Sequence, residues 1–160
     1  MELPLLNCTA DRRGLMYLVS ACLAGINCKY DGGNNEREEI KNLVREGKAI
    51  LVCPEQLGGL PTPRLPSEIR GDRVFNVKGE EVTENFYRGA YETLKIAELY
   101  GIKEAIFKAK SPSCGCGQIY DGTFSGRLIE GDGITTRILK KKGIKVMTEV
   151  EFCEKAKKSK

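Results

Sequence analysis

Four short runs of apolar residues recur along the chain, separated by glycine-rich loops and by stretches with helical spacing. They cover about residues 16–23, 49–53, 105–109 and 144–147. Continuous apolar runs of this length, bounded by turn residues, are typical of strands that are buried on both faces of a sheet. The pattern therefore predicts four buried strands.

Between these runs, apolar residues return every three or four positions, as they do on one face of a helix. This spacing predicts helices over about residues 36–46, 84–100 and 133–142, and a glycine follows each of them. Alternating strands and helices favour a parallel sheet with helices on its faces. We expect a three-layer α/β fold, Rossmann-like, with a mostly parallel sheet of about four strands and flanking helices. Residues 72–82 alternate around Lys78-Gly79 and predict a small hairpin.

The periodic part of the chain covers residues 15–152, which we interpret as a single domain. Residues 1–14 show no periodicity and form an N-terminal extension in this interpretation, and residues 153–160 form a Lys-rich tail. Residues 154–160 hold four Lys and one Glu, so most of the net charge of +4 lies there. Such an end is typically solvated, and basic and aromatic residues are not interleaved as on a nucleic-acid platform. Nucleic acid is therefore not an expected partner.

No run approaches the eighteen apolar residues of a membrane-spanning helix, and charged residues near the start make a poor signal peptide. We therefore expect no membrane association and a cytoplasmic location. The chain has no His, which excludes Ser–His–Asp and Cys–His nucleophiles and every His metal ligand. It has seven Cys, an odd number. In a reducing compartment these thiols are more typical of metal binding or catalysis than of disulfides.

Three of the cysteines, Cys22, Cys53 and Cys114, lie at or just beyond the ends of predicted parallel strands. Such strand ends border one crevice, where ligands bind in open α/β sheets. The thiols could be small buried apolar groups, but three in the same structural place indicate a soft metal centre. A zinc site would need a fourth ligand, from Cys28 or Cys116. A 4Fe-4S cluster held by three thiolates would keep one iron open for a substrate atom.

Polar residues stand beside two of these thiols. Glu55 follows Cys53 by two residues and is a candidate general base, or else a solvent-exposed turn carboxylate. Ser111 and Ser113 flank Pro112 next to Cys114 and could orient water or substrate, or only form turn hydrogen bonds. A thiol redox protein is a further alternative, which the lack of a C-x-x-C pair argues against.

Several long motifs resemble one family, the thiouracil desulfurases, over about residues 16–150. They are Ser20-Ala21-Cys22-Leu23, Asn27-Cys28-Lys29-Tyr30-Asp31-Gly32, Cys53-Pro54-Glu55-Gln56-Leu57-Gly58-Gly59-Leu60-Pro61-Thr62-Pro63-Arg64, Ser111-Pro112-Ser113-Cys114-Gly115 and Tyr120-Asp121-Gly122-Thr123-Phe124-Ser125-Gly126. The resemblance implies a 4Fe-4S enzyme that removes sulfur from a thiolated pyrimidine such as 2-thiouracil. It makes residues 15–152 a desulfurase-like domain.

The same resemblance assigns roles to residues. Cys22, Cys53 and Cys114 would hold the cluster, with Cys28 as an alternative to Cys22, and Glu55 and Ser111 would be catalytic. The substrate sulfur would bind the open iron while C=S is hydrolysed to C=O with release of sulfide. The expected partner is a small thiolated pyrimidine, and no obligatory protein partner is implied. The alternative function is a zinc-stabilised, non-catalytic module that binds a small molecule or another protein.

Overall fold

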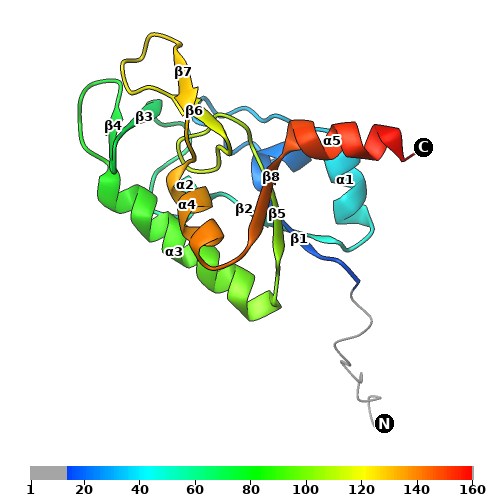
Figure 1. The fold of residues 1–160 in the computed structure, drawn as a ribbon. Helices are drawn as coiled ribbons and strands as arrows, with labels where there is room; N and C mark the ends of the chain where they lie inside the picture. The colour runs from blue at the N-terminus through cyan, green and yellow to red at the C-terminus, as the bar shows by residue number, and fades with distance from the viewer. Residues whose placement is uncertain (1–13, 160) are drawn as a thin grey trace.

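A four-stranded parallel sheet forms the centre of the protein, whose computed structural model describes residues 14–159. Its strands are β1 (Tyr17–Ser20), β2 (Ala49–Val52), β5 (Glu104–Phe107) and β8 (Lys145–Thr148). They lie side by side in the order β2-β1-β5-β8, and every neighbouring pair is parallel (Figure 1). All four match the apolar runs, so the predicted sheet is confirmed.

Helices cover both faces of this sheet. Helices α1 (Glu38–Arg45) and α5 (Glu149–Lys158) lie on one face, and α3 (Thr83–Tyr100) and α4 (Ile134–Lys141) lie on the other (Figure 1). The strands separate two apolar cores because successive side chains point to opposite faces. The structure therefore has the three layers and the α/β class that the sequence predicts.

Neighbouring residues of β1 and β5 show this separation directly. Leu18 and Phe107 belong to the larger core with α3 and α4, whereas Val19 and Ile106 pack with Ile40 of α1 in the smaller core. All five side chains are fully buried. Two-sided burial explains why these strands read as continuous apolar runs and not as alternating patterns.

Six short helices and strands lie outside the central sheet, and the sequence predicted none of them with its observed bounds. They are η2 (Ala21–Ala24), α2 (Pro54–Leu57), β3 (Ser67–Arg70), β4 (Arg73–Asn76), β6 (Gln118–Tyr120) and β7 (Leu128–Glu130). The hairpin predicted over residues 72–82 is partly right, because β4 does fold back and Phe75 bridges to Glu81. However, the main partner of β4 is β3, with antiparallel pairing.

The C-terminal residues are helical where the sequence suggested a separate tail. Helix α5 runs through the boundary placed between residues 152 and 153, and its Cys153 is buried. Thr148 caps this helix by accepting a hydrogen bond from the backbone N–H of Glu151 at 3.2 Å. Residues 1–13 of the proposed N-terminal extension lie outside the described part of the chain. Within residues 14–159, no helix is both long and apolar enough to cross a membrane.

The order of the strands determines where a ligand site can form. The chain leaves β1 for β2 on one side of it and then crosses to β5 on the other side. The connections beyond the carboxyl ends of β1 and β5 therefore diverge, which opens a crevice at that edge of the sheet.

Candidate active site

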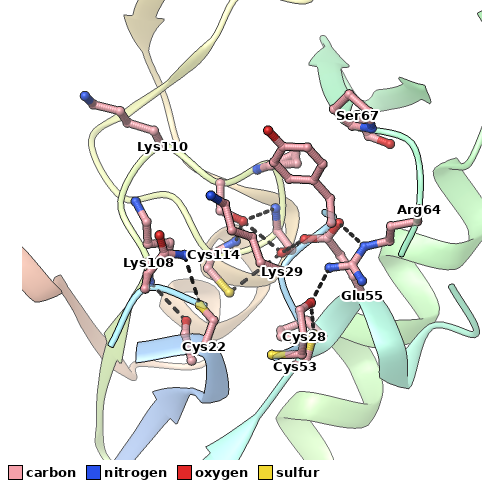
Figure 2. A pocket seen from close by; sticks show the side chains of 18 of the residues that line it. Cys22, Cys28, Lys29, Cys53, Glu55, Arg64, Ser67, Lys108, Lys110 and Cys114 are labelled. Carbon is pink, nitrogen blue, oxygen red and sulfur yellow. Dashed lines mark hydrogen bonds and ion pairs between the residues drawn. The ribbon is translucent and has the colours of Figure 1, made fainter. Parts of the chain in front are cut away.

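A cavity of about 580 Å³ lies at the carboxyl ends of β1, β2 and β5. All the predicted site residues line it, so residues far apart in the sequence come together there (Figure 2). They are Cys22, Cys28, Cys53, Glu55, Ser111 and Cys114.

Each thiol reaches the cavity from a different segment. Cys22 lies in η2 directly after β1, and Cys53 is the residue between β2 and α2. Cys114 comes from the loop after β5, and Cys28 from the loop that follows η2. Cys28 and Cys114 are buried, whereas Cys22 and Cys53 are partly exposed. Free thiols from four segments thus surround one space.

Cys28 interacts with two of the other thiols and changes their acidity. Its hydrogen bond lowers the pKa of Cys53 to about 6 and, together with the Asn35 amide, lowers the pKa of Cys22. The same two contacts raise the pKa of Cys28 itself. Burial raises the pKa of Cys114. Cys22 and Cys53 are therefore the thiols best prepared to act as thiolates, the form that binds metals.

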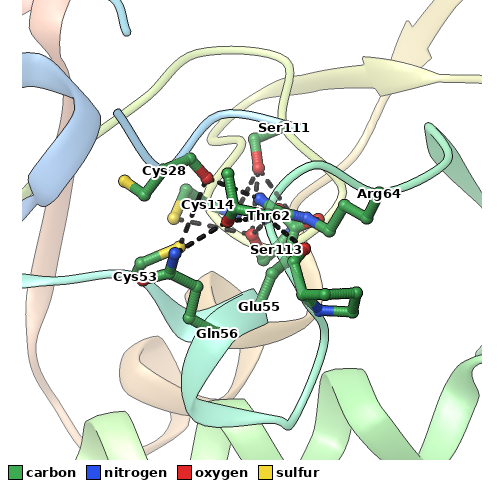
Figure 3. Close-up of polar contacts among 10 residues, drawn as sticks. Cys28, Cys53, Glu55, Gln56, Thr62, Arg64, Ser111, Ser113 and Cys114 are labelled. Carbon is green, nitrogen blue, oxygen red and sulfur yellow. Dashed lines mark hydrogen bonds and ion pairs between the residues drawn. The ribbon is translucent and has the colours of Figure 1, made fainter. Parts of the chain in front are cut away.

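A carboxylate is held next to these thiols by an arginine and a serine. Arg64 Nε donates to Glu55 Oε1 at 3.2 Å, and Ser113 Oγ donates to Glu55 Oε2 at 2.9 Å (Figure 3). Only 15% of the Glu55 side chain and 6% of the Arg64 side chain are exposed. Glu55 is therefore not the solvent-exposed turn residue of the alternative interpretation.

Arg64 is itself fixed by the Pro-rich loop that carries it. Its guanidinium donates to Cys28 O at 2.8 Å, to Thr62 Oγ1 at 2.9 Å and to Pro61 O at 3.2 Å. The arginine thus joins the loop after α2 to the Cys28 segment and to Glu55. Arg64 ends the long Cys53–Arg64 motif, but the sequence predicted no role for it.

The two serines have different surroundings. Ser113 contacts Glu55, whereas Ser111 Oγ accepts the backbone N–H groups of Ser113 at 3.2 Å and Cys114 at 3.0 Å. The two hydroxyl oxygens are 3.0 Å apart. Ser111 therefore shapes the turn that carries Cys114, and Ser113 is the hydroxyl in contact with the carboxylate. The spacing of two serines around a proline does not show which one turns inward, and only the family resemblance assigned a catalytic role to Ser111; both serines line the cavity.

Two other described cysteines, Cys116 and Cys153, do not line the cavity. Cys116 Sγ lies 3.5 Å from Val146 O. Cys8 lies outside the described residues. Within residues 14–159, no three Cys, Asp or Glu side chains converge tightly enough to hold a single metal ion. A four-iron cluster is larger than one ion and takes thiolates from around its corners, so a cavity lined by Cys22, Cys53 and Cys114 fits this group.

The family profile of the 2-thiouracil desulfurases matches residues 17–151. The chain belongs to the 2-thiouracil desulfurase family. This match confirms the resemblance seen in the motifs and covers the complete central sheet. It makes the protein a member of an enzyme family and disfavours a non-catalytic zinc module.

Two similar proteins support the assignment to this family. The "Uncharacterized protein YbbK" of Bacillus subtilis (strain 168) is 45% identical over 147 residues, which cover 86% of this chain and 97% of that protein. A solved structure of a "[4Fe-4S]-dependent thiouracil desulfidase TudS (DUF523Vcz)" is 42% identical and superposes with a TM-score of 0.84. The superposition covers 88% of this chain and 94% of that chain.

Proposed function

We propose that this protein hydrolyses the C=S group of a thiolated pyrimidine to C=O and releases sulfide. The observation that carries the proposal is the Glu55 carboxylate, held by Arg64 and Ser113 at a cavity that is lined by thiols. The family match and the [4Fe-4S]-dependent desulfidase of the same fold support it. A cavity of about 580 Å³ is in the size range of small-molecule sites, which supports a free thiolated pyrimidine as substrate.

The residues that would hold a 4Fe-4S cluster are Cys22, Cys53 and Cys114, with Cys28 as the alternative to Cys22. When bound, such a cluster supplies an iron with an open coordination position, which attracts a soft thiocarbonyl sulfur and withdraws electrons from the C–S bond. Asn35 Nδ2 donates to Cys22 Sγ at 3.6 Å, and hydrogen bonds of this kind stabilise a ligating thiolate. Metal content of the Cys22→Ser and Cys28→Ser variants separates the two assignments.

Residues of the chain would activate the attacking water. Glu55 takes a proton from water at Oε1 or Oε2 while the water oxygen attacks the ring carbon that carries the sulfur. Ser113 and Arg64 hold the carboxylate in place during this step, and Ser111 keeps Ser113 and Cys114 in their turn. The second O–H proton passes to the sulfur, which leaves as hydrosulfide as the C=O group forms, and Glu55 then returns its proton to solvent. No net electron transfer occurs.

The first test is the iron and acid-labile sulfide content of protein purified without oxygen, together with its activity on 2-thiouracil. We expect about four of each per chain, as in a 4Fe-4S cluster, and release of uracil and sulfide. A cluster without this activity would contradict the proposed substrate. The zinc alternative predicts about one zinc per chain and no iron, even after anaerobic reconstitution.

A further inference from the structure

Phe124 is an aromatic side chain in the same cavity that the chemistry described so far does not use. It lies in the loop between β6 and β7 and has a φ of 58°, in the left-handed region. Bulky residues adopt this region at a cost, and such strain concentrates at functional sites. Within residues 14–159, only Lys110 shares this feature among the residues other than glycine.

Burial in the core does not explain this conformation. Phe124 is half-buried and belongs to neither of the two apolar cores. Phe124 instead lines the cavity that holds Glu55 and the thiols. The left-handed backbone therefore places an aromatic residue at the site and not in the interior.

Strand β3 holds the loop in this shape. Glu68 Oε1 accepts the backbone N–H groups of Gly122 at 3.0 Å and of Phe124 at 3.1 Å. Arg70 Nε donates to Gly122 O at 2.9 Å. Gly122 has a φ of 92°, and a Cβ atom there would lie 2.7 Å from Ile69 O, so the loop approaches β3 more closely than a side chain would allow. Three hydrogen bonds between β3 and the loop that joins β6 to β7 thus fix the position of Phe124.

We propose that Phe124 stacks against the planar heteroaromatic ring of the substrate and that Glu68 is a positioning residue that presents it. The proposal rests on the proposed function for the identity of the ring, a thiolated pyrimidine. The face of an aromatic side chain stacks on any nucleobase ring, which explains how an apolar residue serves a polar ligand. Stacking acts on the bound substrate and on the transition state alike, so its loss raises KM and leaves kcat nearly unchanged.

The kinetic test uses the cluster-loaded enzyme and 2-thiouracil. Phe124→Ala should raise KM roughly tenfold, as expected for the loss of one stacking contact, with kcat changed less than about twofold. Phe124→Tyr keeps an aromatic face and should behave like the wild type. Glu68→Ala should raise KM because the loop loses two acceptor contacts, and Glu68→Gln should restore it because its amide oxygen can still accept both N–H groups. An unchanged KM in Phe124→Ala would overturn the proposal.

A fluorescence measurement gives a readout that is independent of turnover. The chain has no Trp, so Phe124→Trp introduces a single Trp at the cavity, which can be excited at wavelengths where the six Tyr residues do not absorb. Uracil should quench this fluorescence in a saturable way. The control is Tyr91→Trp, at an exposed position of α3 that does not line the cavity, and it should show no saturable quenching.

The two experiments separate failure of this inference from failure of the proposed function. If the wild type does not act on 2-thiouracil but uracil quenches the Phe124→Trp variant, the proposed reaction is wrong and ring binding stands. The stacking role of Phe124 is wrong if the wild type is active but uracil does not quench Phe124→Trp. It is also wrong if uracil quenches Phe124→Trp and Tyr91→Trp equally.

Discussion

Glu55 is held through both of its carboxylate oxygens, by a guanidinium on one side and a hydroxyl on the other. This arrangement directs the carboxylate and limits its motion in a part of the cavity with little exposure to solvent. A general base needs such placement more than it needs mobility, because proton transfer depends on the approach of the two heavy atoms.

Replacing Glu55 tests its role as the base. Glu55→Gln keeps the shape and a hydrogen-bond acceptor for Arg64 but cannot take a proton. We expect turnover of 2-thiouracil to fall about 100-fold or more, with the absorbance of the iron–sulfur cluster unchanged. Glu84→Gln, at an exposed position of α3, is the matched control and should retain full activity. Full activity in Glu55→Gln would exclude Glu55 as the base.

At the residue scale, much of the cavity lining could be predicted, because strand ends of a parallel sheet meet at one edge. Cys22, Cys53 and Cys114 were placed together on that basis, and all three line the cavity. The contacts of Arg64 and Ser113 could not be predicted, because they depend on loop conformation and on which side chain turns inward. Phe124 stood out only as part of a motif shared with the family, because left-handed backbone at a Phe leaves no signal in the sequence.

At the scale of elements, α2 and α3 touch through their backbones. A Cβ atom on Gly89 of α3 would lie 1.8 Å from Pro54 O, and one on Gly58 would lie 2.0 Å from Asn85 O. Asn85 Nδ2 also donates to Gly58 O at 2.9 Å. Because α2 carries Glu55, these glycines connect the packing of the long helix to the position of the carboxylate.

The substitution Gly89→Ala should therefore destabilise the protein. In an open helix this change stabilises by about 1 kcal/mol, but here the methyl group meets backbone that cannot move cheaply. We expect a loss of about 2–3 kcal/mol in the free energy of unfolding, measured in urea, and a lower activity. Tyr91→Ala on the exposed face of α3 should change stability by less than about 0.5 kcal/mol. An increase in stability for Gly89→Ala would contradict this packing.

The hydrophobic pattern does not predict the two small hairpins, β3-β4 and β6-β7. The segments of β3 and β6 each carry a single buried apolar residue, Ile69 and Ile119, so neither forms a run or a clear alternation. Their pairing depends on contacts between distant segments. The long α3, in contrast, has six buried residues on one side and was predicted almost to its ends.

For the whole molecule, the sequence predicted the layers and the parallel sheet but not the order of its strands. That order decides which strand ends adjoin. Cys22 and Cys114 follow the neighbouring strands β1 and β5, with Cys53 after β2 on the other side of β1. A cluster bound by all three would tie these strands together.

Cluster loading should consequently stabilise the entire domain. A ligand present at 100 times its dissociation constant adds about 2.7 kcal/mol to the free energy of unfolding, which corresponds to a rise in Tm of about 5–10 °C. Calorimetry of loaded protein and of protein treated with an iron chelator under anaerobic conditions measures this difference. The triple variant Cys22→Ser, Cys53→Ser, Cys114→Ser should show the same Tm in both states. Equal Tm values for the loaded and stripped wild type would contradict a cluster that joins the strands.

The wide spacing of the three thiols along the chain also bears on how the protein matures. Cys22 and Cys53 are synthesised early, but Cys114 joins them only after β5 has taken its place beside β1. A nascent chain on the ribosome that has not yet released residue 114 would lack one of the three proposed ligands. If these three thiols hold the cluster, its delivery follows translation of most of the protein, and a truncated chain that ends before β5 would be a poor acceptor for iron and sulfide.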